Sequence, residues 1–559
     1  MNILGISCFH HDSSACLITK DNIYAAQEER FNRSKYSEVF PSNAIRFCLK
    51  AANIKFRDID YVGFYERPYL KFKRVVLNYL KTYPFSLPNF LTSMPQWLDQ
   101  RLIFPLLLKE EFGEEKIILY GKHHLSHAAS SFLVSPFSKA AILTVDGIGE
   151  YTSATYGIGK GNKIFLLKEM CYPNSLGFLY SIITAYLGFR VFSGEGKVMA
   201  LAQYGEPEYV EHFKKEVVDI KEDGSFSLNP DYFWFNRGNR MYSNKFVKVF
   251  GPPRREGDII KQRHYNMAAT LQNITEEILI KMARFVYSET KVDKLCAAGG
   301  VFLNVTANTR ILQETPFNEI FVQPAAGDAG TSLGVAKYIQ HSLFNIDRDY
   351  IMTTASLGPE FSNSEISNYL TKEGIRYTEF EDVDLVKYIA RQIYDNKIVG
   401  WFQGRMEWGP RALGNRSILA NPCNPEMKDI LNYKVKHREP FRPYGISILR
   451  EELSDFFSLD IDSPFMLFVG KVRPSKKSMI PSALHVDETS RIQTVTRSEN
   501  GIYYELIKEF RKISGVPLII NTSFNDKGKP IVCSPKDACE CFFNTKMDFL
   551  VLGNCVIKK

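Results

Sequence analysis

The sequence lacks the features of membrane and secreted proteins. No run approaches the ~18 uninterrupted apolar residues that a membrane-spanning helix needs. The most apolar segment, Tyr83–Phe112, is interrupted by prolines and charged residues. The N-terminus has no basic stretch followed by an apolar core, so we expect no signal peptide. These absences predict a cytoplasmic protein with no membrane association.

Cysteine is present but shows no pattern. Ten cysteines are scattered from Cys8 to Cys555, and no Cys-x-x-Cys spacing occurs; the nearest pair is Cys539 and Cys541. This excludes a disulfide framework and a zinc ribbon, and indicates a reducing compartment. A Walker A sequence is also missing, which excludes a P-loop nucleotide site.

The remaining composition is that of a folded protein with more than one domain. The chain has 559 residues, of which 45% are hydrophobic and 24% charged. At ~150 residues per domain, this length is too great for one ordinary core. Lys and Arg number 70 against 62 Asp and Glu, giving a formal charge of +8. Such a mild excess does not indicate a nucleic-acid binder, but it suits a protein that holds anionic small molecules.

A strand–turn–strand pattern occurs twice in the first third of the chain. A shift of 139 positions superposes Ser14-Ala15 on Ser153-Ala154, and in both copies the first loop is polar. Duplicated hairpins of this kind would suit two related phosphate-gripping lobes. The predicted strands are Ile3–Cys8, Ala15–Thr19 and Ile23–Gln27, then Ala141–Asp146, Ala154–Ile158 and Lys163–Glu169.

Strands and helices then alternate, which predicts an α/β fold. The polar segment Asp347–Asn363 is typical of a domain boundary. We predict a first domain over residues 1–355, a linker over 356–378 and a second domain over 379–559.

Three of the ten histidines fall within five residues, from His123 to His127. On a helix, His123 and His127 share one face at i, i+4, a spacing suited to chelating a metal. Imidazole binds iron, zinc, nickel or cobalt, so the pair does not choose among them. The alternative is a helix with buried, hydrogen-bonded histidines.

Two aspartates can complete a metal shell. Asp146 ends a predicted strand, and Asp328 lies in a glycine-rich turn. Each has a structural alternative, because Asp146 can stabilise a turn and Asp328 can cap a helix. Two histidines with a carboxylate are a recurrent arrangement for ferrous iron.

Glycines precede two predicted helices, at Gly299-Gly300 and at Gly327–Gly330. Backbone amides at such positions bind phosphate or ribose oxygens, and glycine permits close approach. Ordinary strand–helix turns use the same residues, so this pattern leaves both interpretations open.

The second predicted domain contains a dense basic set. Eight Lys and Arg lie between Arg405 and Arg442, with Trp401 and Trp408 close by, and Arg491 follows later. Arginine binds phosphate bidentately, and lysine adds a point charge. A solvated basic face and a single-stranded nucleic-acid site are the alternatives. Many of these residues lie among glycines and prolines, which favours a pocket.

His11, in the first predicted hairpin loop, could act as a general base on a hydroxyl group. A loop histidine without function is the alternative, and the sequence does not separate the two.

Eight segments together resemble the O-carbamoyltransferases of the nodulation-protein, cephamycin and tobramycin type. They run in the same order over nearly the whole chain. The segments are His11-Asp12, Glu28–Phe31, His123–His127, Gly194–Ala200, Ala298–Asn304, Trp408–Arg416, Arg438–Arg442 and Asn521–Asn525. At the end of the fourth segment and just beyond it, Ala200 and Gln203 stand where relatives often carry Gly and Pro.

The resemblance implies a fold and an activity. The first domain would be TsaD-like, with a duplicated actin/hexokinase-like (ribonuclease-H-like) fold, and the second would be a YrdC-like α/β domain. The YrdC-like domain would form carbamoyl adenylate from carbamoyl phosphate and ATP with Mg²⁺. The first domain, with bound Fe²⁺ or another divalent metal, would transfer the carbamoyl group to a hydroxyl of a small molecule. The oligomeric state stays open, with a homodimer as one alternative.

The resemblance also implies roles for individual residues. The metal ligands would be His123, His127, Asp146 and Asp328, and His11, Lys436 and Arg442 would be catalytic. Gly299, Gly300, Asn304 and Gly327 would contact a nucleotide in the first domain. The residues expected to bind carbamoyl phosphate and ATP phosphates are Arg411, Arg416, Lys436, Arg442, Arg491, Asn521 and Ser523.

Two other functions are considered. A tRNA threonylcarbamoyl-transfer enzyme would need a strongly basic surface, which a charge of +8 does not favour. A non-catalytic nucleotide sensor would need neither a metal pair nor a second phosphate pocket. We therefore predict a partner that is a small hydroxylated molecule, and no nucleic-acid partner.

Overall fold

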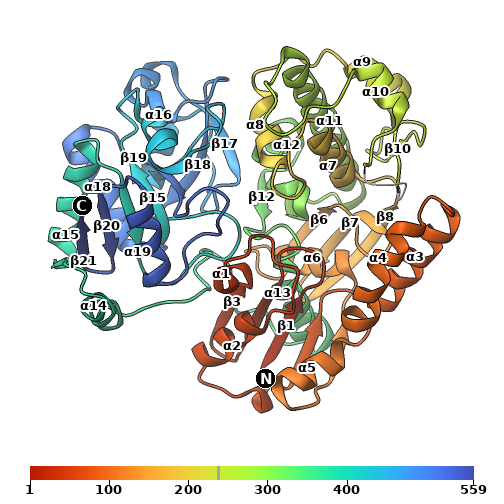
Figure 1. Cartoon of the computed structure of the whole chain (residues 1–559), viewed down its shortest axis with the longest axis horizontal. Helices are drawn as coiled ribbons and strands as arrows, with labels where there is room; N and C mark the ends of the chain where they lie inside the picture. Colours follow the sequence, from red (N-terminus) through yellow and green to blue (C-terminus); the bar gives the residue numbers. More distant parts are fainter. Residues whose placement is uncertain (236–239) are drawn as a thin grey trace. The chain divides into compact units, whose positions relative to one another are not determined.

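The computed structural model describes residues 1–235 and 240–559 and divides them into two compact units (Figure 1). The first contains Met1–Tyr24 and Glu38–Ile351; the second contains Ala25–Ser37 and Met352–Lys559. The division at Ile351 lies within the polar segment predicted as a boundary. Residues 356–378, expected to be a linker, include helix α14 (Asn363–Lys372), whose Ile366 and Leu370 are buried in a core of the second unit.

The first unit has two five-stranded sheets with the same topology. Their orders are β3-β2-β1-β4-β5 and β8-β7-β6-β11-β12. In each, the central strand pairs antiparallel with the next strand in sequence and parallel with a later one. The strands are β1 Ile3–Ser7, β2 Ser14–Ile18, β3 Ile23–Gln27, β4 Tyr61–Phe64, β5 Ile118–Tyr120, β6 Lys139–Val145, β7 Thr152–Lys160, β8 Lys163–Cys171, β11 Lys294–Ala298 and β12 Glu319–Val322.

The two sheets correspond to the two copies of the strand–turn–strand pattern seen in the sequence. The register agrees with the shift of 139 positions, because Ile6 pairs with Ala15 in one sheet and Val145 with Ala154 in the other. A small hairpin of β9 (Val218–Ile220) and β10 (Phe226–Leu228) is added to the second copy.

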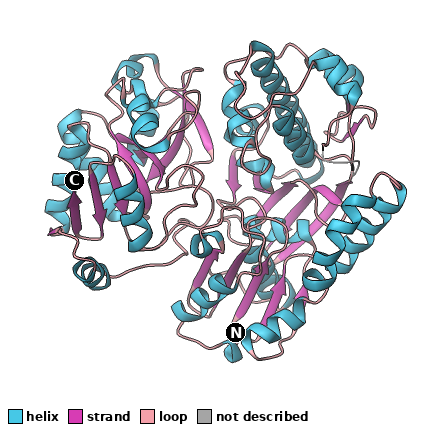
Figure 2. Ribbon diagram, viewed as in Figure 1, coloured by secondary structure: helices cyan, strands magenta, loops and turns pink. Residues whose placement is uncertain are grey.

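Helices cover the sheets of the first unit (Figure 2). They begin and end at α2 Ser42–Ala51, α3 Pro68–Lys81, α4 Leu87–Gln96, α5 Phe104–Phe112, α6 His123–Phe132, α7 Leu176–Tyr186, α8 Glu195–Ala202, α9 Val210–His212, α10 Asn244–Phe250, α11 Gln262–Thr290, α12 Val305–Glu314 and α13 Gly330–Lys337. Of these, α6 and α13 pack tightly together. A Cβ atom on Gly334 of α13 would lie 1.8 Å from the backbone oxygen of Ser126 in α6, so only glycine allows this approach.

The second unit is built on one mixed nine-stranded sheet, in the order β13-β21-β20-β14-β15-β19-β16-β18-β17. Apolar clusters line the sheet; one includes Trp401, Ile446 and Phe510, and another includes Phe402, Phe524 and Phe542. Strands β14 and β15 carry buried residues throughout their length, as expected for a sheet covered on both sides. The strands are β13 Thr378–Glu379, β14 Val399–Phe402, β15 Arg416–Ala420, β16 Gly445–Leu449, β17 Phe468–Lys471, β18 Thr489–Val495, β19 Leu518–Ser523, β20 Phe549–Leu552 and β21 Cys555–Lys558.

Helices of the second unit are mostly short. Besides α14, they are α1 Glu29–Asn32, α15 Asp382–Tyr394, α16 Met427–Leu431, α17 Leu453–Phe456, α18 Gly501–Ser514 and α19 Pro535–Asn544. The mixed α/β character predicted from the sequence is confirmed. Within residues 1–235 and 240–559, no helix has both the length and the hydrophobicity needed to cross a membrane.

Candidate functional site

Four predicted ligands meet at one buried point of the first unit. His123 and His127 lie on α6, Asp146 directly follows β6, and Asp328 precedes α13. Each offers one ligand atom, and these atoms all lie within 4.8 Å of one another. All four side chains are buried. We call these residues the His/Asp cluster.

The distances within the His/Asp cluster fit a single divalent cation. The two Nε2 atoms lie 3.1 Å apart, His123 Nε2 lies 3.3 Å from Asp146 Oδ2, and His127 Nε2 lies 3.6 Å from Asp328 Oδ1. Ligands about 2.1 Å from a metal are separated by roughly 3.0–3.4 Å at angles between 90° and tetrahedral. Asp328 Oδ1 has no hydrogen-bond partner although it is buried, so the cluster offers an unsatisfied carboxylate oxygen that could bind a cation. The residues present therefore fit a metal ion.

Local structure explains how the ligands come together. His123 and His127 are one helical turn apart, so their rings leave α6 on the same side. Asp146 accepts a hydrogen bond from Gly300 N through Oδ1 (2.7 Å), which turns Oδ2 towards the histidines. Glu150 accepts bonds from the backbone N–H of His123 at 3.1 and 3.2 Å. This contact fixes the first turn of α6 and with it the position of His123.

Glu66, Lys71 and Glu150 also belong to the site, although no sequence motif marked them. Glu66 Oε2 lies 3.9 Å from His123 Nδ1 and 2.6 Å from Lys71 Nζ, and all three side chains are buried. At 3.9 Å Glu66 forms no hydrogen bond with His123 Nδ1, which is buried without a hydrogen-bond partner. Its carboxylate nevertheless lies on the side of the ring where such groups orient metal-binding histidines. One signal was available, because Glu66 follows the end of β4 much as Asp146 follows β6.

His124, although it stands between the two ligands, points elsewhere. Its ring bonds to Thr144 Oγ1 (2.7 Å) and to the backbone oxygen of Thr152 (3.0 Å). Burial and the neighbouring histidines lower its pKa well below the ordinary value. His124 is thus a neutral structural residue.

The predicted base, His11, lies beside the His/Asp cluster. Its Nδ1 is 2.9 Å from Asp12 Oδ2, and its Nε2 is 3.7 Å from Asp328 Oδ2. His10 Nδ1 is 3.1 Å from the same Asp328 oxygen. Burial lowers the pKa of His11, but Asp328 and Asp12 outweigh it and raise the pKa to about 9. A cation on Asp328 would weaken that effect and return His11 towards the neutral form that a base requires.

The predicted nucleotide-contacting residues fall into two groups. Gly299 and Gly300 pack against the end of β6, where a Cβ on Gly299 would meet Val145 O at 2.2 Å. Asn304 caps α12 by accepting from Ala307 N, and its amide is paired with Gln272. Gly327, in contrast, has open space where a side chain would be. Of the four, Gly327 is best placed for the backbone to approach a ligand.

In the second unit, five basic side chains form a positively charged cluster: Arg411, Lys436, Arg438, Arg442 and Arg491. Lys436 is buried and the four arginines are half-buried. Arg491 is on β18 opposite Gly445 of β16, and Gly445 is opposite Asn521 of β19, so adjacent strands carry the site. Glu439 lies 3.8 Å from Arg442, at the edge of the set. We call these five residues the cationic cluster.

Burial and repulsion between like charges lower the pKa values of two groups in the cationic cluster. Burial, then Arg411, Arg438 and Arg442, lower the pKa of Arg491 well below its ordinary value. Burial and Arg438 likewise lower the pKa of Lys436. Lys436 Nζ donates to Asn525 Oδ1 (2.8 Å) and lies 3.3 Å from Ser523 Oγ. Desolvated like charges are costly unless an anion joins them, so a bound anion would stabilise this arrangement.

Arg416 is separate from the cationic cluster. Its guanidinium donates to the backbone oxygens of Gln403 (2.7 Å) and Pro359 (3.1 Å) and stacks on Phe402 at 3.5 Å. These contacts indicate a structural role in place of the predicted phosphate contact. Asn521, by comparison, donates to Gln493 Oε1 and leaves its own buried Oδ1 without a partner.

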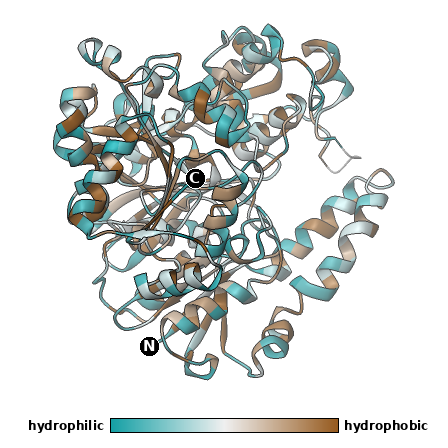
Figure 3. Ribbon diagram, turned by 60° about the vertical axis from the view of Figure 1, so that its left-hand side comes forward, coloured by the Kyte–Doolittle hydropathy of each residue, from teal (hydrophilic) through white to brown (hydrophobic). Residues whose placement is uncertain are grey.

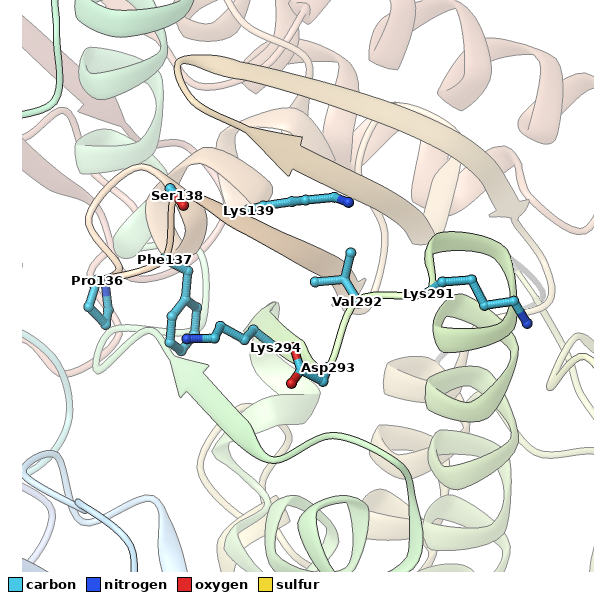
Figure 4. Close-up of a pocket in the computed structure, with 8 residues that line it drawn as sticks. All are labelled: Pro136, Phe137, Ser138, Lys139, Lys291, Val292, Asp293 and Lys294. Atoms are coloured by element: carbon cyan, nitrogen blue, oxygen red, sulfur yellow. The ribbon is translucent and has the colours of Figure 1, made fainter.

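A surface pocket of about 340 Å³ in the first unit contains none of these residues (Figure 4). It is lined by residues 136–139, which lead into β6, and by residues 291–294, which lead into β11. The chemistry described above lies elsewhere, in the two clusters of polar side chains.

Family models account for most of the chain. A carbamoyltransferase N-terminus model matches residues 2–337, and a carbamoyltransferase C-terminus model matches residues 390–559. The chain belongs to the carbamoyltransferase family. The prediction of a transferase is thereby confirmed, and so is the family inferred from the eight sequence segments.

Relatives cover the chain almost completely. An uncharacterised protein of Synechocystis sp. is 42% identical over all of this chain and 97% of its own length. Nodulation protein NolNO of Sinorhizobium fredii is 38% identical over 99% of this chain and 79% of its own length. Among solved structures, full-length HypF in a phosphate- and nucleotide-bound form has a TM-score of 0.32 and 14% identity, covering 60% of this chain and 55% of HypF.

Proposed function

We propose that the chain is an ATP-dependent O-carbamoyltransferase that modifies a hydroxyl of a small molecule. The cationic cluster carries this proposal, because it groups five basic side chains, and cationic neighbours help to lower the pKa values of Arg491 and Lys436. Such a set of side chains suits a polyanionic substrate. Carbamoyl phosphate and the triphosphate of ATP are such anions. In this proposal the second unit is YrdC-like and the first is an actin/hexokinase-like pair of lobes.

The proposed chemistry balances over two stages. In the second unit, water cleaves carbamoyl phosphate to carbamate and phosphate, and a carbamate oxygen attacks the α-phosphorus of ATP. Carbamoyl adenylate forms and pyrophosphate leaves. In the first unit, the acceptor oxygen attacks the carbamoyl carbon, AMP leaves, and the hydroxyl proton passes to a base. Arg411, Arg442 and Arg491 would offset the charge on the departing phosphates.

The His/Asp cluster would hold the divalent metal, with His123, His127, Asp146 and Asp328 as ligands. When bound, the metal supplies Lewis-acid polarisation of an oxygen ligand. His11 would accept the acceptor's proton at Nε2, while Asp12 holds its Nδ1. The buried setting would keep water from the reactive mixed anhydride.

The first experiment asks whether transfer depends on ATP. Purified protein is incubated with carbamoyl phosphate, ATP and a panel of hydroxylated acceptors, and AMP, pyrophosphate and carbamoylated product are measured. We expect the three products in equal amounts. Transfer that persists without ATP would refute the proposed adenylate.

The second experiment tests the division of labour. His127→Ala should abolish bound metal and product formation, but leave carbamoyl-phosphate-dependent exchange of pyrophosphate into ATP unchanged. His212→Gln, outside the His/Asp cluster, serves as the control. If the exchange is lost in folded His127→Ala protein, the assignment of the two stages to separate units is wrong.

A further inference from the structure

Helices α3 and α4 form an antiparallel hairpin in the connection between β4 and β5. Tyr79 stacks edge-on against Phe90 at 5.6 Å and bonds to Ser93 (2.9 Å), and Phe72 packs against Trp97 at 5.5 Å. Hydrophilic and hydrophobic residues alternate along both helices (Figure 3). Apart from Lys71, no residue of the hairpin has a role in the site described above.

The orientation of α3 is the reverse of that of an ordinary surface helix. Its charged residues Lys71 and Arg74 are 3% and 8% exposed, while Tyr69 and Leu80 are 68% and 67% exposed. Lys71 is turned inward to Glu66, and Arg74 donates to Gly149 O at 3.1 Å. Because these inner contacts are polar, the apolar face of the helix is left in solvent.

The exposed apolar residues continue around the tip of the hairpin onto α4. Tyr83 and Phe85 lie at the tip, 67% and 65% exposed, and Leu91 follows at 63%. Large apolar side chains gathered in this way mark an interaction surface. The hairpin surface consists of Tyr69, Leu70, Leu77, Leu80, Tyr83, Phe85, Leu87, Leu91 and Leu98.

The net positive charge of the hairpin favours an anionic partner. From Arg67 to Arg101 there are six basic residues and one acidic residue, Asp99. Two of the six, Lys71 and Arg74, are buried, whereas Arg67, Lys73 and Lys81 are exposed. Lys73 and Lys81 are exposed on the same side of α3 as Leu77 and Leu80, given 100° per residue. A second copy of the hairpin would bring like charges together, which disfavours self-association, whereas an anionic surface complements them.

We propose that the hairpin surface docks on an anionic lipid bilayer. Tyr and Phe suit the headgroup boundary, leucines contribute buried apolar area, and lysines attract anionic headgroups. The surface lies in the interface and spans nothing, so the search for long apolar runs in the sequence does not detect it. α3 also carries Lys71, which contacts Glu66 beside His123, so the docking element and the His/Asp cluster are linked through one helix.

Vesicle flotation of the full-length chain tests this proposal. One set of vesicles is phosphatidylcholine alone, and the other contains about 30% phosphatidylglycerol. We expect binding to the anionic vesicles only, and a marked loss when ionic strength rises from about 0.1 M to about 1 M. Failure to bind anionic vesicles, or equal binding to neutral ones, would overturn the proposal.

Two variants separate the apolar and electrostatic contributions. The triple variant Leu80→Gln, Tyr83→Ser, Phe85→Ser and the double variant Lys73→Glu, Lys81→Glu should each weaken binding about tenfold or more. Their matched controls are Val486→Ser with Phe543→Ser, and Lys387→Glu with Lys536→Glu, which alter exposed residues of the second unit. Unchanged far-ultraviolet circular dichroism shows that the variants fold.

The remaining outcomes also decide the matter. If hairpin variants bind vesicles as the wild type does, the hairpin is not the docking surface. If the wild type ignores vesicles but is a dimer that the triple variant dissociates, the surface serves a second copy of the chain. Either result refutes the proposal that the hairpin surface docks on a lipid bilayer.

Discussion

At the residue scale, this protein buries charged side chains in positions where desolvation costs free energy. The cationic cluster gathers five buried or half-buried basic groups, and the His/Asp cluster gathers two carboxylates with two imidazoles. Neither arrangement is favourable by itself, because desolvated charges need a compensating partner. Both clusters are therefore expected to cost stability in the free protein and regain it when a ligand binds.

Arg491→Met tests this cost in the second unit. The substitution removes one of several neighbouring like charges and keeps similar volume, so the unliganded protein should gain about 1–3 kcal/mol in free energy of unfolding. Stabilisation by pyrophosphate should be lost. Urea denaturation with and without pyrophosphate measures both. A loss of stability in the free variant would contradict the anion-site assignment; Arg473→Met, at an exposed position, is the control.

Lys337 gives a pH-dependent prediction. Burial, then the effect of Arg348, lower its pKa to about 8, below the value of 10.5 for an exposed lysine. Between these values the unfolded chain binds more protons than the folded chain, so wild-type stability gains a contribution as pH rises through this window. Lys337→Met should therefore stabilise the protein by about 1–3 kcal/mol at pH 7, and by less near pH 10.

Urea titrations at a series of pH values measure this difference. The advantage of Lys337→Met should shrink steadily as pH rises. A difference between wild type and variant that does not change with pH would show that Lys337 keeps an ordinary pKa.

At the element scale, the packing of α6 against α13 positions the His/Asp cluster. His123 and His127 belong to α6, and Asp328 lies just before α13, so the separation of the two helices sets the distances between ligands. The contact of Gly334 with Ser126 O brings them close. On the other side of α13, a Cβ on Gly5 of β1 would lie 1.9 Å from Ser332 O, so this helix has no room to retreat.

Gly334→Ala should force α6 and α13 apart. We expect a loss of about 1–3 kcal/mol in stability from overpacking, and at least tenfold weaker metal binding from displaced ligands. Equilibrium dialysis with metal analysis measures the second effect. Gly196→Ala in α8 is the control, because a Cβ atom added there would have no neighbour within 4 Å. Unchanged metal affinity in Gly334→Ala would mean that helix spacing does not define the site.

At the scale of the whole molecule, two units with separate cores carry two chemically different sites. A ligand stabilises the structure to which it binds, so each should protect its own unit. Hydrogen exchange should show a divalent metal slowing exchange in α6 and in residues 323–337. Pyrophosphate should slow exchange in residues 411–442 and in β18. Protection by pyrophosphate confined to the first unit would contradict the assignment.

Several parts of the structure followed from sequence pattern. Strand β3 (Ile23–Gln27) has the predicted bounds, because turn-forming residues mark its start locally. The duplication was visible for the same reason. The linker expected at 356–378 instead includes α14, because Ile366 and Leu370 pack on residues distant in the sequence.

The sequence by itself determined which side chains could bind a metal or a phosphate, since helical spacing and strand ends are local properties. The i, i+4 spacing also distinguished His123 and His127 from the other histidines as candidate metal ligands. Only the tertiary structure decided that Asp328 meets them, that Glu66 and Lys71 stand behind His123, and that Arg416 bonds to backbone oxygens apart from the cationic cluster. It also decided that α3 turns its apolar face outward. These features depend on contacts between segments that are distant in the sequence. A local sequence pattern does not contain the free energies of such contacts.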